Sequence, residues 1–205
     1  MDVGKGIMDT MNDEPIVNIV GGLVTLGPLR RDLLPRYQLW MNDFAVVRNL
    51  GTPPIPMTME REEGWFERAA KSDDTFSFTI YERASGMPIG NTSLMGLDWR
   101  SRTAEFGILI GEVDGRGKGY GTETARLLLD YAFVALGLHS VYLRVHEYNL
   151  AGRRAYEKAG YREFGRRRQS QQTGGKFWDA IYMDCLASEF TSPVLAAVFA
   201  PDTPR

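Results

Sequence analysis

Apolar and polar positions follow two different periods along this chain. Alternation at every second residue, or a short run of β-branched and apolar residues, is typical of strands. Such strand patterns cover residues 17–26, 75–82, 87–95, 103–111, 140–145, 161–168 and 177–186. Apolar residues spaced three or four positions apart predict amphipathic helices. This helical spacing covers residues 31–49, 58–70, 122–136 and 149–158.

The length of the chain and the lack of internal boundaries limit the number of domains. The chain has 205 residues, which is close to the usual size of one domain. No internal repeat and no shift in composition divides it. We therefore expect a single domain over residues 16–187, preceded by a flexible lead-in at 1–15. A tail at 188–205 contains three prolines and no predicted element.

Composition excludes several classes of protein. Hydrophobic residues make up 43% of the chain and charged residues 24%, which excludes disorder of the whole chain. The 24 basic and 26 acidic residues give a net charge of −2, which does not favour a nucleic acid as partner. Cys185 is the single cysteine, so no intramolecular disulfide can form, which fits a reducing compartment. Without an apolar run of about 20 residues or a secretory pattern, we expect a cytoplasmic protein with no membrane partner.

The most informative segment is glycine-rich. Residues 105–121 read E-F-G-I-L-I-G-E-V-D-G-R-G-K-G-Y-G, a predicted strand followed by a loop that leads into a predicted helix. Glycines let the backbone approach a ligand closely, and a helix N-terminus offers unpaired N–H groups and a partial positive charge. This order of elements favours a phosphate or pyrophosphate group as the ligand of the loop. The dinucleotide pattern G-x-G-x-x-G does not occur, and Gly119 follows Lys118 where a nucleotide-triphosphate loop needs Ser or Thr.

A different pattern does match. Arg116, Gly119 and Gly121 form R-x-x-G-x-G, Asn149 follows the next predicted strand, and residues 155–161 read A-Y-E-K-A-G-Y. With these motifs the chain resembles the GNAT superfamily of acetyl-CoA-dependent N-acetyltransferases over residues 20–186. Within it the chain is most similar to the branch of spermidine and ribosomal-protein N-terminal acetyltransferases. The resemblance implies an α+β fold of three α/β/α layers, in which a mixed, mostly antiparallel, twisted sheet is flanked by helices.

The resemblance also implies a set of residues that bind acetyl-CoA, the acyl donor. The pyrophosphate would lie on the backbone amides of a loop made by Arg116, Gly117, Lys118, Gly119, Tyr120 and Gly121. Leu109 and Ile110 would offer backbone groups to the pantetheine arm and the thioester carbonyl. Asn149 would hold the pantetheine arm or a water, or act only as a helix N-cap, which asparagine favours on its own.

Two residues are candidates for catalysis. Tyr156 matches the family tyrosine that protonates the departing CoA thiolate, and a phenol with a pKa near 10 still holds its proton at neutral pH. Glu105 would remove a proton from the acceptor, because freeing an alkylamine of pKa near 10.4 at pH 7 costs roughly 4–5 kcal/mol. The alternatives are an aromatic side chain used for packing and a solvated carboxylate on a strand.

The expected activity is direct transfer of an acetyl group to a primary amine of a small molecule or a protein N-terminus. The alternative is a non-catalytic CoA sensor of the same fold. His139, His146 and Cys185 lack the spacing of a metal site, so we expect no metal, and exposed sheet edges make a homodimer plausible. A basic segment at 153–168 and an acidic one at 60–74 are either solvated faces or sites for the CoA phosphate and a cationic amine.

Overall fold

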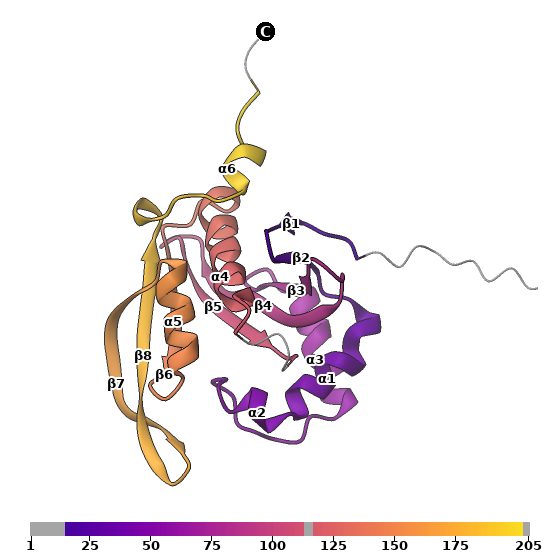
Figure 1. Ribbon diagram of the computed structural model, residues 1–205, viewed down its shortest axis with the longest axis vertical. Coiled ribbons are helices and arrows are strands. Elements are labelled where there is room, and N and C mark those ends of the chain that lie inside the picture. Colours follow the sequence, from indigo (N-terminus) through magenta and orange to yellow (C-terminus); the bar gives the residue numbers. More distant parts are fainter. Residues whose placement is uncertain (1–14, 113–116, 203–205) are drawn as a thin grey trace, which may run out of the picture.

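The computed structural model describes residues 15–112 and 117–202 (Figure 1). Within these residues the chain folds around one eight-stranded sheet with the order β1-β2-β3-β4-β5-β6-β8-β7. The strands are β1 (Ile19–Val20), β2 (Val24–Pro28), β3 (Phe76–Glu82), β4 (Pro88–Asp98), β5 (Thr103–Ile110), β6 (Ser140–His146), β7 (Arg162–Thr173) and β8 (Lys176–Leu186). β5 and β6 are parallel and the remaining neighbours are antiparallel. The predicted mixed, mostly antiparallel sheet is confirmed.

Helices cover both faces of this sheet. They are α1 (Leu34–Asn42), α2 (Phe44–Val47), α3 (Met59–Ala70), α4 (Tyr120–Asp130), α5 (Leu150–Ala159) and α6 (Leu195–Val198). The larger core lies between the sheet and α4 and α5, and a smaller apolar cluster lies under α1 and α3. β5 contributes side chains to both of these apolar clusters. Phe106 is buried in the larger core, whereas Leu109 packs on the smaller cluster.

Two of the sequence predictions are wrong in detail. The single strand predicted at 17–26 is a hairpin of β1 and β2, because the chain reverses at Gly21 and Gly22. In the tail, where no element was predicted, a short 3-10 turn at Ala187–Glu189 is followed by α6. The tail is held by Asp130 of α4, whose carboxylate accepts hydrogen bonds from the amides of Val194 and Leu195 at 3.0 and 2.8 Å.

The remaining boundaries move by a few residues. Thr58 is the N-cap of α3, where its hydroxyl accepts a hydrogen bond from the Arg61 amide. The predicted helix at 122–136 begins at Tyr120 and continues past Asp130 as a π-helical turn, Tyr131–Ala135. Among the described residues, no helix combines the length and the apolar character that a membrane crossing requires.

One buried carboxyl on α3 makes stability depend on pH. Glu62 is only 3% exposed, and burial raises its pKa to about 7 from the ordinary 4.5. Between these two values the folded state holds a proton that the unfolded state has lost, so stability falls as pH rises. Above pH 7 the buried charge costs roughly 3 kcal/mol, at about 1.4 kcal/mol for each pKa unit.

We expect Glu62→Gln to stabilise the protein by about 2 kcal/mol near pH 8.5 and to change little near pH 4.5, because glutamine carries no charge to bury. Urea unfolding of both proteins at the two pH values measures this difference. Glu63→Gln, on the exposed side of the same helix, is the matched control and should have no effect at either pH. An equal effect of Glu62→Gln at both pH values would contradict the prediction.

Candidate active site

The site is built on a fork between the two parallel strands. β5 and β6 pair at only three positions, Thr103 with Ser140, Ala104 with Val141, and Glu105 with Tyr142. Beyond the fork β5 stays paired with β4 and β6 stays paired with β8. The two strands therefore separate from Phe106 onward, and among the described residues one edge of each is free of strand partners there.

The register of β5 decides which backbone groups face this gap. Gly111 donates its amide hydrogen to the Ile89 carbonyl at 2.9 Å. Every second residue pair of an antiparallel ladder is hydrogen-bonded, so the pairs two and four positions earlier on β5, which include Leu109 with Asn91, also bond to β4. The residues between them turn their N–H and C=O groups to the opposite side. Ile108 and Ile110 are thus the backbone groups that face the gap. Ile110 was among the predicted site residues; Ile108 was not, and Leu109 directs its backbone to β4.

A cleft of about 340 Å³ lies at the open end of the fork. Its walls come from the free edge of β5, the start of α4, and α5. Most of the predicted cofactor-binding residues line it: Leu109, Ile110, Gly117, Gly119, Tyr120, Gly121 and Asn149. Arg116 lies outside the described residues, and Lys118 is next to the lining glycines with its ammonium over the Tyr120 ring at 5.9 Å from the centroid.

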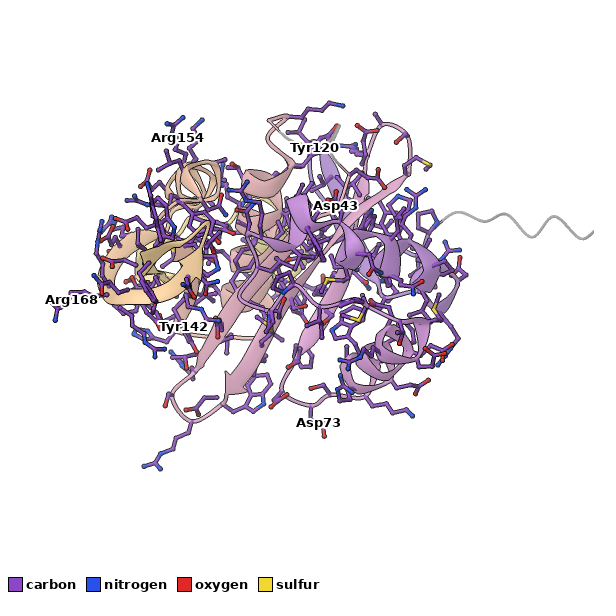
Figure 2. All side chains as sticks on the ribbon, turned by 90° about the horizontal axis from the view of Figure 1, so that it is seen from below. Asp43, Asp73, Tyr120, Tyr142, Arg154 and Arg168 are labelled. Carbon is purple, nitrogen blue, oxygen red and sulfur yellow. The ribbon has the colours of Figure 1, made fainter. Side chains whose placement is uncertain are left out.

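The N-terminus of α4 is open toward this cleft. Gly119 is its N-cap and has φ of +90°, a left-handed conformation that favours glycine, and no side chain of the described residues caps the helix. The first amides of a helix have no partner within the helix, so they remain available to an anion. Arg154 and Lys158 of α5 also line the cleft, and Figure 2 shows Arg154 and Tyr120 toward the same edge of the molecule.

Tyr120 contributes to this loop through its backbone. Its ring is buried in the main core and its hydroxyl donates a hydrogen bond to the Glu82 carboxylate on β3. That hydrogen bond raises the pKa of the Tyr120 phenol above its ordinary value. The side chain therefore fixes the start of α4 to the sheet.

A second carboxylate fixes the same helix end to the N-terminal hairpin. Glu123 accepts hydrogen bonds from the amides of Gly22, Leu23 and Val24 at 2.9, 2.6 and 2.7 Å. These three charge-assisted hydrogen bonds satisfy the amides of the turn between β1 and β2. They join this turn to a residue about 100 positions later in the sequence. The space is tight, because a Cβ on Gly21 would lie 2.8 Å from the Glu123 carboxylate.

Tyr156 reaches the cleft from α5. Its ring packs edge-on against Phe106 and Tyr161 at centroid distances of 6.0 and 6.1 Å. Burial raises the pKa of its phenol to about 12, so it keeps its proton throughout the neutral and mildly alkaline range. Among the described residues nothing hydrogen-bonds to its hydroxyl, which leaves the proton available to a bound molecule.

Asn149 fits both roles that the sequence suggested, helix N-cap and ligand-binding residue. Its Oδ1 accepts from the Gly152 amide at 3.0 Å, which makes it the N-cap of α5. The residue also lines the cleft, and within the described part of the chain no acceptor is bonded to its Nδ2. One side chain can therefore start α5 and offer a donor to a ligand.

Glu105 lies elsewhere in the fork. It is the last paired residue of β5 and it is not among the residues that line the cleft. Tyr156 packs on Phe106, and adjacent strand residues point to opposite faces, so Glu105 lies on the other face of the sheet. The structure thus places the two predicted catalytic residues on opposite sides of the fork.

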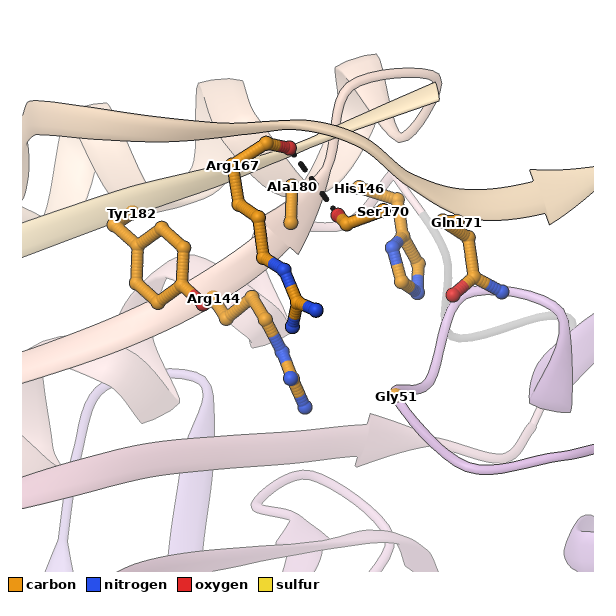
Figure 3. Close-up of a pocket in the computed structure, with 8 residues that line it drawn as sticks. All are labelled: Gly51, Arg144, His146, Arg167, Ser170, Gln171, Ala180 and Tyr182. Carbon is orange, nitrogen blue, oxygen red and sulfur yellow. Dashed lines mark hydrogen bonds between the residues drawn. The ribbon is translucent and has the colours of Figure 1, made fainter. Parts of the chain in front are cut away.

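A small second pocket lies on the face that carries Glu105 (Figure 3). It has a volume of about 40 Å³, and Arg144, His146, Arg167 and Tyr182 are among the side chains that line it. Arg167 belongs to the basic segment at 153–168, which the sequence predicted to be either a solvated face or a site for the CoA phosphate. Arg144, His146 and Tyr182 were not predicted to belong to a site. The alternation Tyr142, Arg144, His146 on an inner strand was the available signal, because a polar row there needs a partner or a ligand. In the described ranges no group of three or more His, Cys, Asp and Glu side chains is placed to hold a metal ion.

Comparison with known proteins agrees with this geometry. The family model described as "Acetyltransferase (GNAT) domain" matches residues 24–162. The chain belongs to the GNAT acetyltransferase family. The fork, the cleft and the glycine-rich start of α4 lie within or at the border of the matched residues.

Individual relatives differ in the acceptor that their names give. A spermidine N(1)-acetyltransferase of Vibrio cholerae is 32% identical over 111 residues, which cover 54% of this chain and 64% of that protein. The chain thus spans less than two thirds of the length of this curated relative. The human alpha/beta-tubulin-N-acetyltransferase 9 is 28% identical over a stretch that covers 71% of this chain and 75% of that protein.

A solved GNAT structure superimposes over most of the chain. The spermidine N-acetyltransferase of Vibrio cholerae, crystallised with CoA and spermine, gives a TM-score of 0.76 at 25% identity. The superposition covers 82% of this chain and 98% of that one. The GNAT fold implied by the sequence motifs is confirmed.

We expect Glu123→Ala to destabilise the protein by about 2–3 kcal/mol, because three amides of the hairpin turn lose their charged acceptor. The start of α4 should also loosen and bind CoA several-fold more weakly. Thermal unfolding and calorimetric titration with CoA measure the two effects. Arg126→Ala, exposed on the same helix, is the control and should leave both unchanged. Wild-type stability of Glu123→Ala would show that the hairpin does not depend on this carboxylate.

Proposed function

We propose that this protein transfers the acetyl group of acetyl-CoA directly to a primary amine, of a small molecule or of a protein N-terminus. One observation carries the proposal. An open helix N-terminus, the free backbone edge of β5 and the unpartnered Tyr156 hydroxyl line one continuous cleft. Each of the three suits a different part of acetyl-CoA.

The residues of the cleft fit the donor from end to end. The amides at the start of α4, with Lys118, Arg154 and Lys158 nearby, suit the negatively charged phosphates. Ile108 and Ile110 offer the backbone groups that an extended pantetheine arm with two amides requires. Bound acetyl-CoA would supply an activated thioester, so no covalent nucleophile of the protein is needed.

The proton transfers can then be assigned to residues on both faces. A backbone N–H at the fork would stabilise the negative charge that develops on the thioester oxygen. Tyr156 would donate its phenolic proton to the leaving sulfur, because it is still protonated at neutral pH. Glu105 would accept the proton of the incoming ammonium from the opposite face, directly or through water.

The non-catalytic sensor is the second candidate. It would bind acetyl-CoA in the same cleft and release no free CoA with any amine. The unpartnered Tyr156 hydroxyl favours an enzyme, because a sensor has no use for a proton donor at the position of the sulfur. The homodimer and the cytoplasmic localisation stay predictions from the sequence.

We expect Tyr156→Phe to lower kcat by about 100-fold while the KM for acetyl-CoA changes little, because only the proton donor is lost. Release of the free CoA thiol in the presence of a mixed amine panel measures the rate. The panel holds polyamines, amino acids, aminoglycosides and peptides with free N-termini.

Tyr131→Phe is the matched control for this experiment. It removes a phenol that is partly buried in the same core and packs on Phe78, away from the cleft lining. Its rate should equal that of the unmodified protein. Acetyl-CoA binding without turnover on the whole panel would favour the sensor, and full activity of Tyr156→Phe would remove this residue from the mechanism.

A further inference from the structure

The face of the sheet opposite α4 and α5 has its own polar lining. Val141, Leu143 and Val145 of β6 are buried in the main core, so Arg144 and His146 point the other way. Glu105 is on this same face, because it pairs with Tyr142, which has the same parity. The second pocket therefore opens on the side from which an acceptor amine would approach the fork.

Two arginines from different strands converge there. Arg144 on β6 lies opposite Tyr182 of β8, and Arg167 on β7 lies opposite Ala180 of β8. The small side chain of Ala180 leaves room between them, and Figure 3 shows both guanidinium groups turned into the same space. Gly51 closes the space from the loop after α2. A Cβ there would lie 2.6 Å from Nη2 of Arg144, so glycine at this position leaves room for the guanidinium group.

These two positive charges are not neutralised. Most other arginines of the basic segment at 153–168, to which Arg167 belongs, are paired: Arg153 and Arg166 with Glu163, and Arg162 with Glu189. Among the described residues, by contrast, the side chains of Arg144 and Arg167 make no ion pair or hydrogen bond. No acidic residue of the described ranges lines the pocket. Two guanidinium groups without a counter-charge form a site for an anion.

His146 adds a second unsatisfied group. The residue is 4% exposed, and its Nε2 lies 3.0 Å from the Leu50 carbonyl oxygen. A carbonyl only accepts, so Nε2 carries a proton, and in the neutral imidazole Nδ1 is then an acceptor. Nδ1 is buried and has no partner among the described residues. A hydrogen-bond donor, such as an ammonium or a water, would satisfy it.

We propose that Arg144 and Arg167 form a specificity site that selects acceptor amines carrying a carboxylate or a phosphate. This inference rests on the proposed acetyl transfer. The pocket is large enough for one such anionic group, and the rest of the acceptor extends toward the fork, where Glu105 faces its amine. A polyamine brings only positive charge and is disfavoured here, in contrast to the acceptor named for the Vibrio cholerae relative.

Matched pairs of acceptors test the anion directly. Glycine is compared with glycinamide, and O-phosphoethanolamine with ethanolamine, while spermidine serves as the cationic reference. The anionic member of at least one pair should have a kcat/KM about tenfold or more above its neutral partner, because it gains charge-assisted bonds. The pair that responds distinguishes a carboxylate from a phosphate. A ratio near one in both pairs, or preference for spermidine, would overturn the proposal.

Variants assign the preference to the two arginines. In Arg144→Gln/Arg167→Gln the ratio of anionic to neutral acceptor should fall toward one, mainly through the KM of the anionic acceptor. Arg168→Gln is the control, because Arg168 projects away from the molecule in Figure 2 and does not line the pocket. Its ratio should equal that of the unmodified protein. An unchanged ratio in the double variant would assign the preference to other residues and contradict the proposal.

A binding measurement separates this inference from the proposed function. N-acetylglycine and N-acetylglycinamide are titrated by calorimetry into the full chain saturated with CoA. The acid should bind about tenfold more tightly than the amide, and the double variant should lose the difference. If this holds while no amine is acetylated, the anion site stands and the transfer proposal fails. If the two bind alike, the anion site is overturned whatever rates are measured.

Discussion

The separation of β5 from β6 is the constraint on which the rest of the site depends. Two parallel strands that stop pairing after Glu105 and Tyr142 leave backbone donors and acceptors without partners. This arrangement is stable because each strand keeps one complete ladder, β5 with β4 and β6 with β8. The unpaired edges then become binding groups, and an extended ligand can complete them in place of the missing strand.

The fork also divides two electrostatic environments. On the side of α5, Tyr156 lies among aromatic rings, and the low polarity there keeps its phenol protonated. On the other side, Glu105 and the two arginines of the second pocket lie on a face rich in charge. A proton donor for the leaving group and a proton acceptor for the nucleophile need opposite tendencies. In the proposed mechanism, Tyr156 of α5 would fill the first role and Glu105 of β5 the second, because they lie on opposite faces of the sheet.

Local patterns predicted most of the fold, and long-range pairing accounts for what they missed. Helical spacing located α3 well, since this signal is local. The hairpin at 17–26 was missed because β-branched residues continue on both sides of Gly21 and Gly22, and the reversal is stabilised by Glu123, about 100 residues away. α6 was missed for the same reason, because its partner is Asp130. The positions of Ile108 at the gap and of the two arginines in the second pocket depend on how neighbouring strands align. The pattern of each strand taken alone does not predict this alignment.

The outer strand β7 has a consequence for self-association of a different kind. It forms one edge of the sheet, and its exposed residues include three consecutive arginines at 166–168. An unprotected edge can add a strand from another copy and continue into an aggregate. A second β7 added antiparallel about this triplet would place arginines opposite arginines, and that repulsion opposes growth. Arg167, which lines the second pocket, would thus also oppose the addition of a strand at this edge.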